Sequence, residues 1–67
     1  MTIIQVLRDG ATVTLSSTEL YMINNALNEV CNALDMDDFS IRMGVERADA
    51  AELLKQIHAL VARMKHI

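Results

Sequence analysis

Two short runs that are rich in β-branched side chains lie within residues 2–16. An Asp-Gly pair, Asp9 and Gly10, separates the runs. This pair favours a two-residue hairpin turn because both residues tolerate positive φ angles. We therefore predict a β-hairpin over residues 2–16 with Asp9 and Gly10 at its tip. That turn sets a register in which Val6 lies opposite Val13 and both side chains share one face.

An amphipathic helix is predicted directly after the hairpin, over residues 17–35. Ser16 and Glu19 have capping-box spacing, in which each side chain accepts a hydrogen bond from the other residue's backbone N–H. Apolar side chains then recur at alternating spacings of three and four residues, which is typical of a helix with one buried face. That face comprises Leu20, Ile23, Leu27, Val30, Cys31 and Leu34, widened by Met22, Ala26 and Ala33. Because it covers about half of the helix circumference, we expect it to contact more than one neighbour.

Residues 36–45 interrupt this helical pattern. Asp37 and Asp38 disfavour a continuing helix, and Gly44 is suited to a helix C-cap. We therefore predict a loop or a short helical turn. Three apolar side chains are expected to reach from this segment into the core: Phe39, Ile41 and Val45.

A second amphipathic helix is predicted over residues 46–66. It begins at Glu46 or at Asp49, since Asp49 and Glu52 again have capping-box spacing. Its apolar positions follow the same helical spacing and form one face. They are Ala50, Leu53, Leu54, Ile57, Leu60, Val61, Met64 and Ile67.

The predicted fold is a single α+β domain over residues 1–67. It consists of an N-terminal β-hairpin followed by two antiparallel amphipathic helices (ββαα) packed over one face of the hairpin. With 67 residues, 52% of them hydrophobic, the chain builds one small core, and its single cysteine excludes an intrachain disulfide. A two-stranded sheet is marginal alone and has two unpaired edges. We therefore predict a homodimer, joined at the hairpin edges or through the wide face of the first helix.

Charge and hydropathy narrow the classes of partner. Six Lys and Arg against nine Asp and Glu give a net charge of −3. The chain thus has few cations to neutralise phosphates, and we expect no nucleic-acid partner. Its apolar runs are far shorter than the roughly 20 residues of a membrane helix, and its first residues lack the pattern of a secretory signal. We therefore expect no membrane partner and a cytoplasmic location.

The first helix is unusually rich in asparagine, which is a mediocre helix former. We predict these asparagines on the side of the helix opposite the apolar face, where solvated polar residues are also normal. Carboxamides offer hydrogen-bond donors and acceptors without charge, and tyrosine is enriched in protein interfaces. We interpret five residues as a candidate protein-binding surface: Tyr21, Asn24, Asn25, Asn28 and Asn32.

Candidate catalytic and metal-binding residues are sparse. Cys31 lies in the apolar stripe, so we predict a buried and unreactive thiol. His58 and His66 are eight residues apart, whereas a helical zinc pair is usually four apart, and we predict His58 half-buried beside the apolar face. The carboxylates of Asp35, Asp37 and Asp38 do not follow the spacing of an EF-hand. We therefore expect no catalytic residue, no cofactor, no metal site and no enzymatic activity.

The favoured hypothesis is a small noncatalytic protein–protein interaction module that acts as a homodimer. Its acidic character suits an immunity-like or antitoxin-like role with a second protein partner. The first alternative is a DNA-binding regulator, in which the dimeric hairpin enters the major groove as a β-ribbon with Gln5, Arg8, Thr12 and Thr14. The second alternative is a small-ligand-binding or enzymatic subunit with a pocket between chains, for which Asp37, Asp38 and His58 are the candidates.

Overall fold

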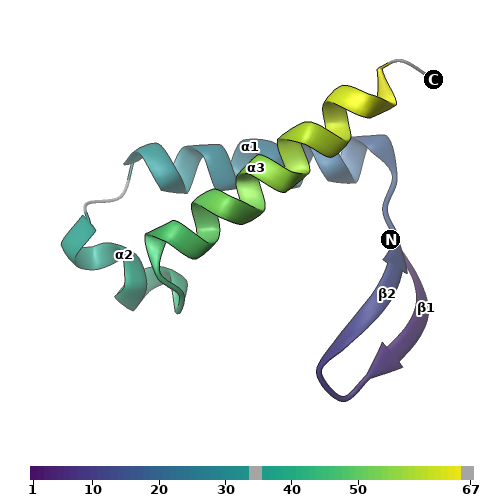
Figure 1. Cartoon of the computed structure of the whole chain (residues 1–67), viewed down its shortest axis with the longest axis horizontal. Helices are drawn as coiled ribbons and strands as arrows, with labels where there is room; N and C mark the ends of the chain where they lie inside the picture. Colours follow the sequence, from purple (N-terminus) through teal and green to yellow (C-terminus); the bar gives the residue numbers. More distant parts are fainter. Residues whose placement is uncertain (34–35, 66–67) are drawn as a thin grey trace.

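The computed structural model describes residues 1–33 and 36–65, and within them two strands precede three helices (Figure 1). The strands are β1 (Thr2–Leu7) and β2 (Gly10–Thr14), and the helices are α1 (Ser17–Ala33), α2 (Met36–Met43) and α3 (Arg47–Met64). An antiparallel hairpin followed by helices confirms the predicted α+β class.

The hairpin turn differs from the Asp-Gly prediction. Its turn residues are Arg8 and Asp9, so that Leu7 pairs with Gly10. Among the described residues, only the glycine at position 44 has a positive φ. The backbone thereby avoids the left-handed conformation that a turn centred on Asp9 and Gly10 would require of Asp9.

The resulting register sorts the side chains of the hairpin by polarity. Val6 lies opposite Ala11 and not opposite Val13, and a bulge between Ile3 and Gln5 brings Ile3 opposite Val13. Because directly opposed side chains share a face of the sheet, one face is apolar and the other is largely polar. The apolar hairpin face consists of Ile3, Val6, Ala11 and Val13, and the other face carries Thr2, Gln5, Leu7, Thr12 and Thr14.

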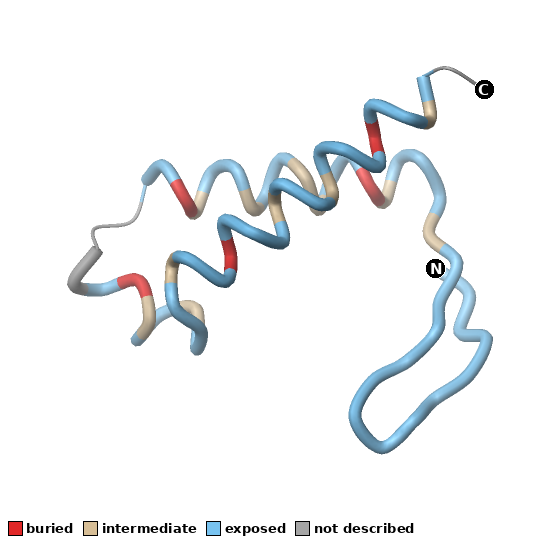
Figure 2. The backbone as a smooth tube through the Cα atoms, viewed as in Figure 1, coloured by how far each residue is buried: buried red, intermediate tan, exposed pale blue. Residues whose placement is uncertain are grey.

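The hairpin does not lie beneath the helices as predicted. Helices α1 and α3 pack against each other and α2 packs against α3, whereas neither strand packs against any described helix. Figure 1 shows the hairpin projecting from the N-terminal end of α1, and every residue of both strands is exposed (Figure 2). The chain thus forms two separate layers, and each of them has an apolar face without a cover of its own.

The core lies between α1 and α3, which run antiparallel (Figure 1). Leu20 and Cys31 of α1 are buried, as is Val61 of α3, in agreement with the predicted apolar stripes. Leu53 and Leu60 belong to the predicted apolar face of α3, but they are 46% and 42% exposed. One helix covers only part of that face, and these leucines have no covering layer.

The segment predicted as a loop or a short turn is the eight-residue helix α2. Asp38 falls in its first turn, where an acidic residue suits the positive pole of the helix dipole. The helix ends at Gly44, which has φ 74° and donates its N–H to the Ser40 carbonyl at 2.9 Å. This geometry confirms the predicted C-cap.

Only one of the three apolar residues predicted to enter the core from this segment does so. Phe39 is 1% exposed, whereas Ile41 and Val45 are exposed. A helix of two turns presents one side to its neighbour, and Ile41 lies two residues, or about 200°, away from Phe39.

Arg47 joins three helices at one end of the core. Helix α3 begins at this residue, directly after the N-cap Glu46, and not at Asp49. The guanidinium of Arg47 donates a hydrogen bond to the backbone carbonyl of Cys31, in the last turn of α1, where carbonyls lack helical partners. It also lies 5.8 Å from the centre of the Phe39 ring. One cation therefore bridges α1, α2 and α3 around the buried Phe39.

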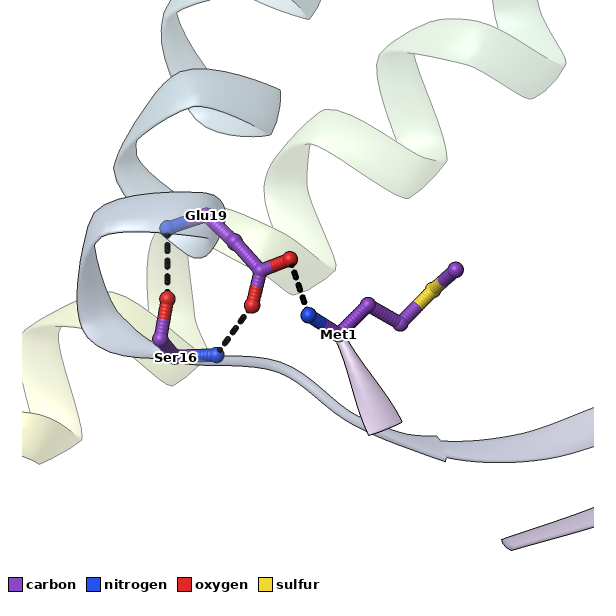
Figure 3. Close-up of polar contacts among 3 residues, drawn as sticks. All are labelled: Met1, Ser16 and Glu19. Carbon is purple, nitrogen blue, oxygen red and sulfur yellow. Dashed lines mark hydrogen bonds and ion pairs between the residues drawn. The ribbon is translucent and has the colours of Figure 1, made fainter. Parts of the chain in front are cut away.

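The junction between the hairpin and α1 contains the predicted capping box. The Glu19 N–H donates to Ser16 Oγ at 3.1 Å, and the Ser16 N–H donates to Glu19 Oε1 at 2.9 Å (Figure 3). The amino-terminal ammonium of Met1 forms an ion pair with Glu19 Oε2 at 2.5 Å. The hydrogen bond from this ammonium, followed by those with Ser16, lowers the pKa of Glu19 from 4.5 to about 2. Both ends of the hairpin are thereby tied to the first turn of α1.

Glu19→Gln is expected to remove a pH-dependent part of the stability. Because the pKa of Glu19 is lower in the folded chain than its ordinary 4.5, the ionised carboxylate stabilises the fold above about pH 4.5 and stops doing so as the pH falls toward 2. The midpoint of thermal unfolding should therefore fall more steeply over this pH range in the wild type than in Glu19→Gln. Glu29→Gln, at an exposed position of the same helix, is the control and should behave as wild type. Equal pH dependence in all three proteins would contradict the assignment.

Phe39→Ala is expected to destabilise the fold by about 3–5 kcal/mol, since it empties the buried cluster. Ile41→Ala is the matched control on the same helix, and at 81% exposure it should change stability by no more than about 0.5 kcal/mol. Urea unfolding at one fixed protein concentration, followed by circular dichroism, measures both. Similar midpoints for the two variants would show that Phe39 does not anchor the helices.

Candidate functional site

Four of the five predicted binding residues share one strip of α1. At about 100° per residue, Tyr21, Asn25, Asn28 and Asn32 fall within one narrow sector of the helix, and all four are exposed. This strip, the Asn face, lies to one side of the buried line formed by Leu20 and the residues that follow it at helical spacing. The structure thus brings together one aromatic side chain and three carboxamides in solvent.

Two of the carboxamides on the Asn face are already ordered by each other. The Asn32 Nδ2 donates to the Asn28 backbone carbonyl at 2.8 Å and to Asn28 Oδ1 at 3.1 Å. These bonds hold both side chains in one arrangement before any partner arrives. A surface with fewer rotamers to immobilise loses less entropy on binding.

Asn24 does not belong to the Asn face, contrary to the prediction. It lies one turn after Leu20, on the flank of the buried line, and it is half-buried. Its Nδ2 donates to Asn25 Oδ1 at 3.4 Å, while its Oδ1 is buried with no hydrogen-bond partner among the described residues. Its position one helical turn from Leu20 turns Asn24 toward the core.

A second surface occupies the other flank of the helix pair. Helical spacing places Met22 and Ala26 on the flank of α1 away from the Asn face. In an antiparallel pair this flank lies on the same side as Leu53 and Leu60 of α3. The apolar helix face is defined by Met22, Ile23, Ala26, Val30, Leu53 and Leu60. Ile23 and Val30 are half-buried and the others are exposed. It contains no charged side chain.

The apolar helix face begins at a hollow beside the hairpin. This hollow has a volume of about 260 Å³ and is lined by Met1, Leu15, Glu19, Met22 and Ile23. Its lining is apolar apart from Glu19, whose carboxylate is held by Met1 and Ser16 (Figure 3). The hollow therefore extends the apolar helix face to the base of the hairpin.

The residues weighed as chemical candidates are dispersed. Cys31 is buried, as predicted. His58 is exposed instead of half-buried, because helical spacing places it on the flank of α3, outside the buried line. It lines a shallow hollow with Leu54, and all the residues of this hollow belong to α3. Asp38 is exposed on α2 and does not line this hollow. The side chain of Asp37, with Asp35 and His66, lies outside the described residues.

Two kinds of site are absent from residues 1–33 and 36–65. These residues contain no group of three metal-ligating side chains that could hold an ion. None of their helices combines the length and the hydropathy that a membrane-spanning helix needs.

Comparison with known proteins adds no relative to this description. No family model matches the sequence, and no curated protein or solved structure is significantly similar to it. The function is therefore inferred from the surfaces themselves.

Sequence reasoning missed the structural part played by Arg47. A cation in the first turn of a helix opposes the helix dipole, so its position in α3 is unfavourable on local grounds. That local cost was the available signal that Arg47 has a tertiary partner. The partners themselves, the Cys31 carbonyl and the Phe39 ring, depend on how α1 and α2 meet α3.

Replacing the carboxamides of the Asn face should change neither the fold nor the mass of the protein in solution. In the triple variant Asn25→Lys, Asn28→Glu, Asn32→Lys all three positions are exposed, and the new Glu and Lys are spaced to form a helical ion pair. Circular dichroism should show unchanged helicity and light scattering an unchanged mass. A mass lower than that of the wild type would place the Asn face inside a contact between copies of the chain.

Proposed function

We propose that this protein is a small noncatalytic protein–protein interaction module that acts as a homodimer in the cytoplasm. The proposal is carried by the amount of surface that one chain leaves uncovered. The accessible surface is 5437 Å², whereas a compact monomer of 7.5 kDa has about 4,250 Å². The excess is about 1,200 Å² per chain, which is the area that each subunit of an obligate homodimer typically buries.

The extended shape supports the same conclusion. The radius of gyration is 13.5 Å, against about 11 Å for a compact domain of this length. The uncovered area includes large apolar side chains from both layers: Ile3, Ile4, Val6 and Leu7 in the hairpin, with Met22, Leu53 and Leu60 in the helices. Contiguous exposed apolar surface in a soluble chain is typical of an interaction site.

The Asn face is the surface proposed for a second protein partner. It lies on the flank of α1 away from the apolar helix face, so a dimer that covers the apolar surfaces leaves it accessible. Its uncharged amides and single tyrosine suit a polar protein surface rather than an anionic one. An immunity-like or antitoxin-like role uses such a surface to bind one specific protein.

A DNA-binding regulator is the second candidate, because the hairpin projects freely and its largely polar face carries Gln5, Thr12 and Thr14. Arg8 at the turn is the cation nearest to this face along the hairpin. The net charge of −3 weighs against phosphate binding. A gel shift at low salt that disappears as the salt rises would favour this candidate.

Light scattering coupled to gel filtration tests the proposed homodimer directly. At micromolar concentration we expect about 15 kDa, twice the 7.5 kDa of one chain. The uncovered apolar area gives association a large driving force, so the dimer should persist on tenfold dilution. A mass of one chain throughout this range would refute the proposal.

A further inference from the structure

We propose that the two copies exchange their hairpins: the apolar hairpin face of each chain packs on the apolar helix face of the other. This inference rests on the proposed homodimer and specifies how it is built. The occupant of the apolar helix face is thereby a second copy of this chain, related to the first by a two-fold axis.

The chain carries two uncovered apolar faces. The most exposed residue of the apolar hairpin face is Val6, at 74%, and that of the apolar helix face is Met22, at 65%. Packing helix face on helix face would leave the hairpin uncovered. Pairing hairpin edges would leave both apolar faces uncovered. Exchange covers both faces of both chains through two equivalent hairpin–helix contacts.

The hairpin of a chain is not free to fold back onto the helices of the same chain. Only residues 15–16 separate β2 from α1, and both ends of the hairpin are fixed at the first turn of α1. Met1, before β1, bonds Glu19 Oε2, and Ser16, after β2, bonds Glu19 through the capping box (Figure 3). The hairpin is therefore held pointing away from the helices, as Figure 1 shows, and its apolar face is available to another chain.

The excess surface of the chain and the lengths of the two faces are compatible with this exchange. The excess surface of about 1,200 Å² per chain fits an interface made of two hairpin–helix contacts. A strand of six residues is about 20 Å long, and the α1 part of the apolar helix face, from Met22 to Val30, is about 12 Å long, so one hairpin spans it. None of the residues that define the two faces is charged, so the contact between them desolvates no charge of their own.

Complementation between two variants tests the exchange. Val6→Lys places a charge on the apolar hairpin face, and Met22→Lys places one on the apolar helix face. Both positions are exposed in the single chain, so neither substitution disturbs the packing within that chain. Each variant alone should dimerise at least about 100-fold more weakly, because at both contacts a lysine ammonium replaces an apolar side chain and has to be desolvated. The controls Thr12→Lys, on the polar hairpin face, and Asn25→Lys, on the Asn face, should dimerise like wild type.

An equimolar mixture of the two variants should recover a heterodimer by native mass spectrometry and sedimentation. In that heterodimer one unaltered hairpin meets one unaltered helix face, while both lysines fall at the other contact. The mixture should also regain helicity if the separate variants unfold when they dissociate.

The remaining outcomes overturn the exchange. Loss of dimer by only one variant would indicate helix-face packing or hairpin pairing alone, and loss by both without recovery on mixing would exclude reciprocal contacts. In these cases the wild type is still a dimer, so the proposed function survives. A monomeric wild type would overturn both.

Discussion

An amphipathic layer has to be covered by a second layer, and this constraint governs the whole structure. The chain builds two layers, a hairpin and an α1–α3 pair with α2 at one end, but it does not stack one on the other. Its buried residues follow the single contact line between the helices and the cluster around Phe39. The exposed apolar faces are the other halves of these layers, and a second chain is the simplest source of a cover.

Two polar devices fix the geometry that creates these faces. Arg47 fastens the ends of three helices through the Cys31 carbonyl and the Phe39 ring. Glu19 fastens the hairpin to α1 through Ser16 and the Met1 ammonium. Because both devices lie at the ends of elements, they orient the layers without covering them. The Asn face, on the opposite flank of α1 from the apolar helix face, remains in solvent.

Sequence patterns predicted the features that depend on residues close to one another along the chain. The strands, the Ser16–Glu19 capping box, the buried Cys31 and the Gly44 cap follow from residues close in sequence. The turn position was missed because Asp9 avoids a left-handed backbone, and Asn24 was misplaced because helical spacing puts it beside Leu20. The detachment of the hairpin could not be predicted, since it depends on how two layers meet.

We propose that the folding of this chain is coupled to its association. This coupling is tested most directly by the midpoint of thermal unfolding, measured over a hundredfold range of protein concentration. For a dimer whose subunits cover each other's apolar faces, the midpoint should rise steadily with concentration, since dissociation accompanies unfolding. A midpoint that stays constant across this range, together with the mass of one chain, would contradict the account.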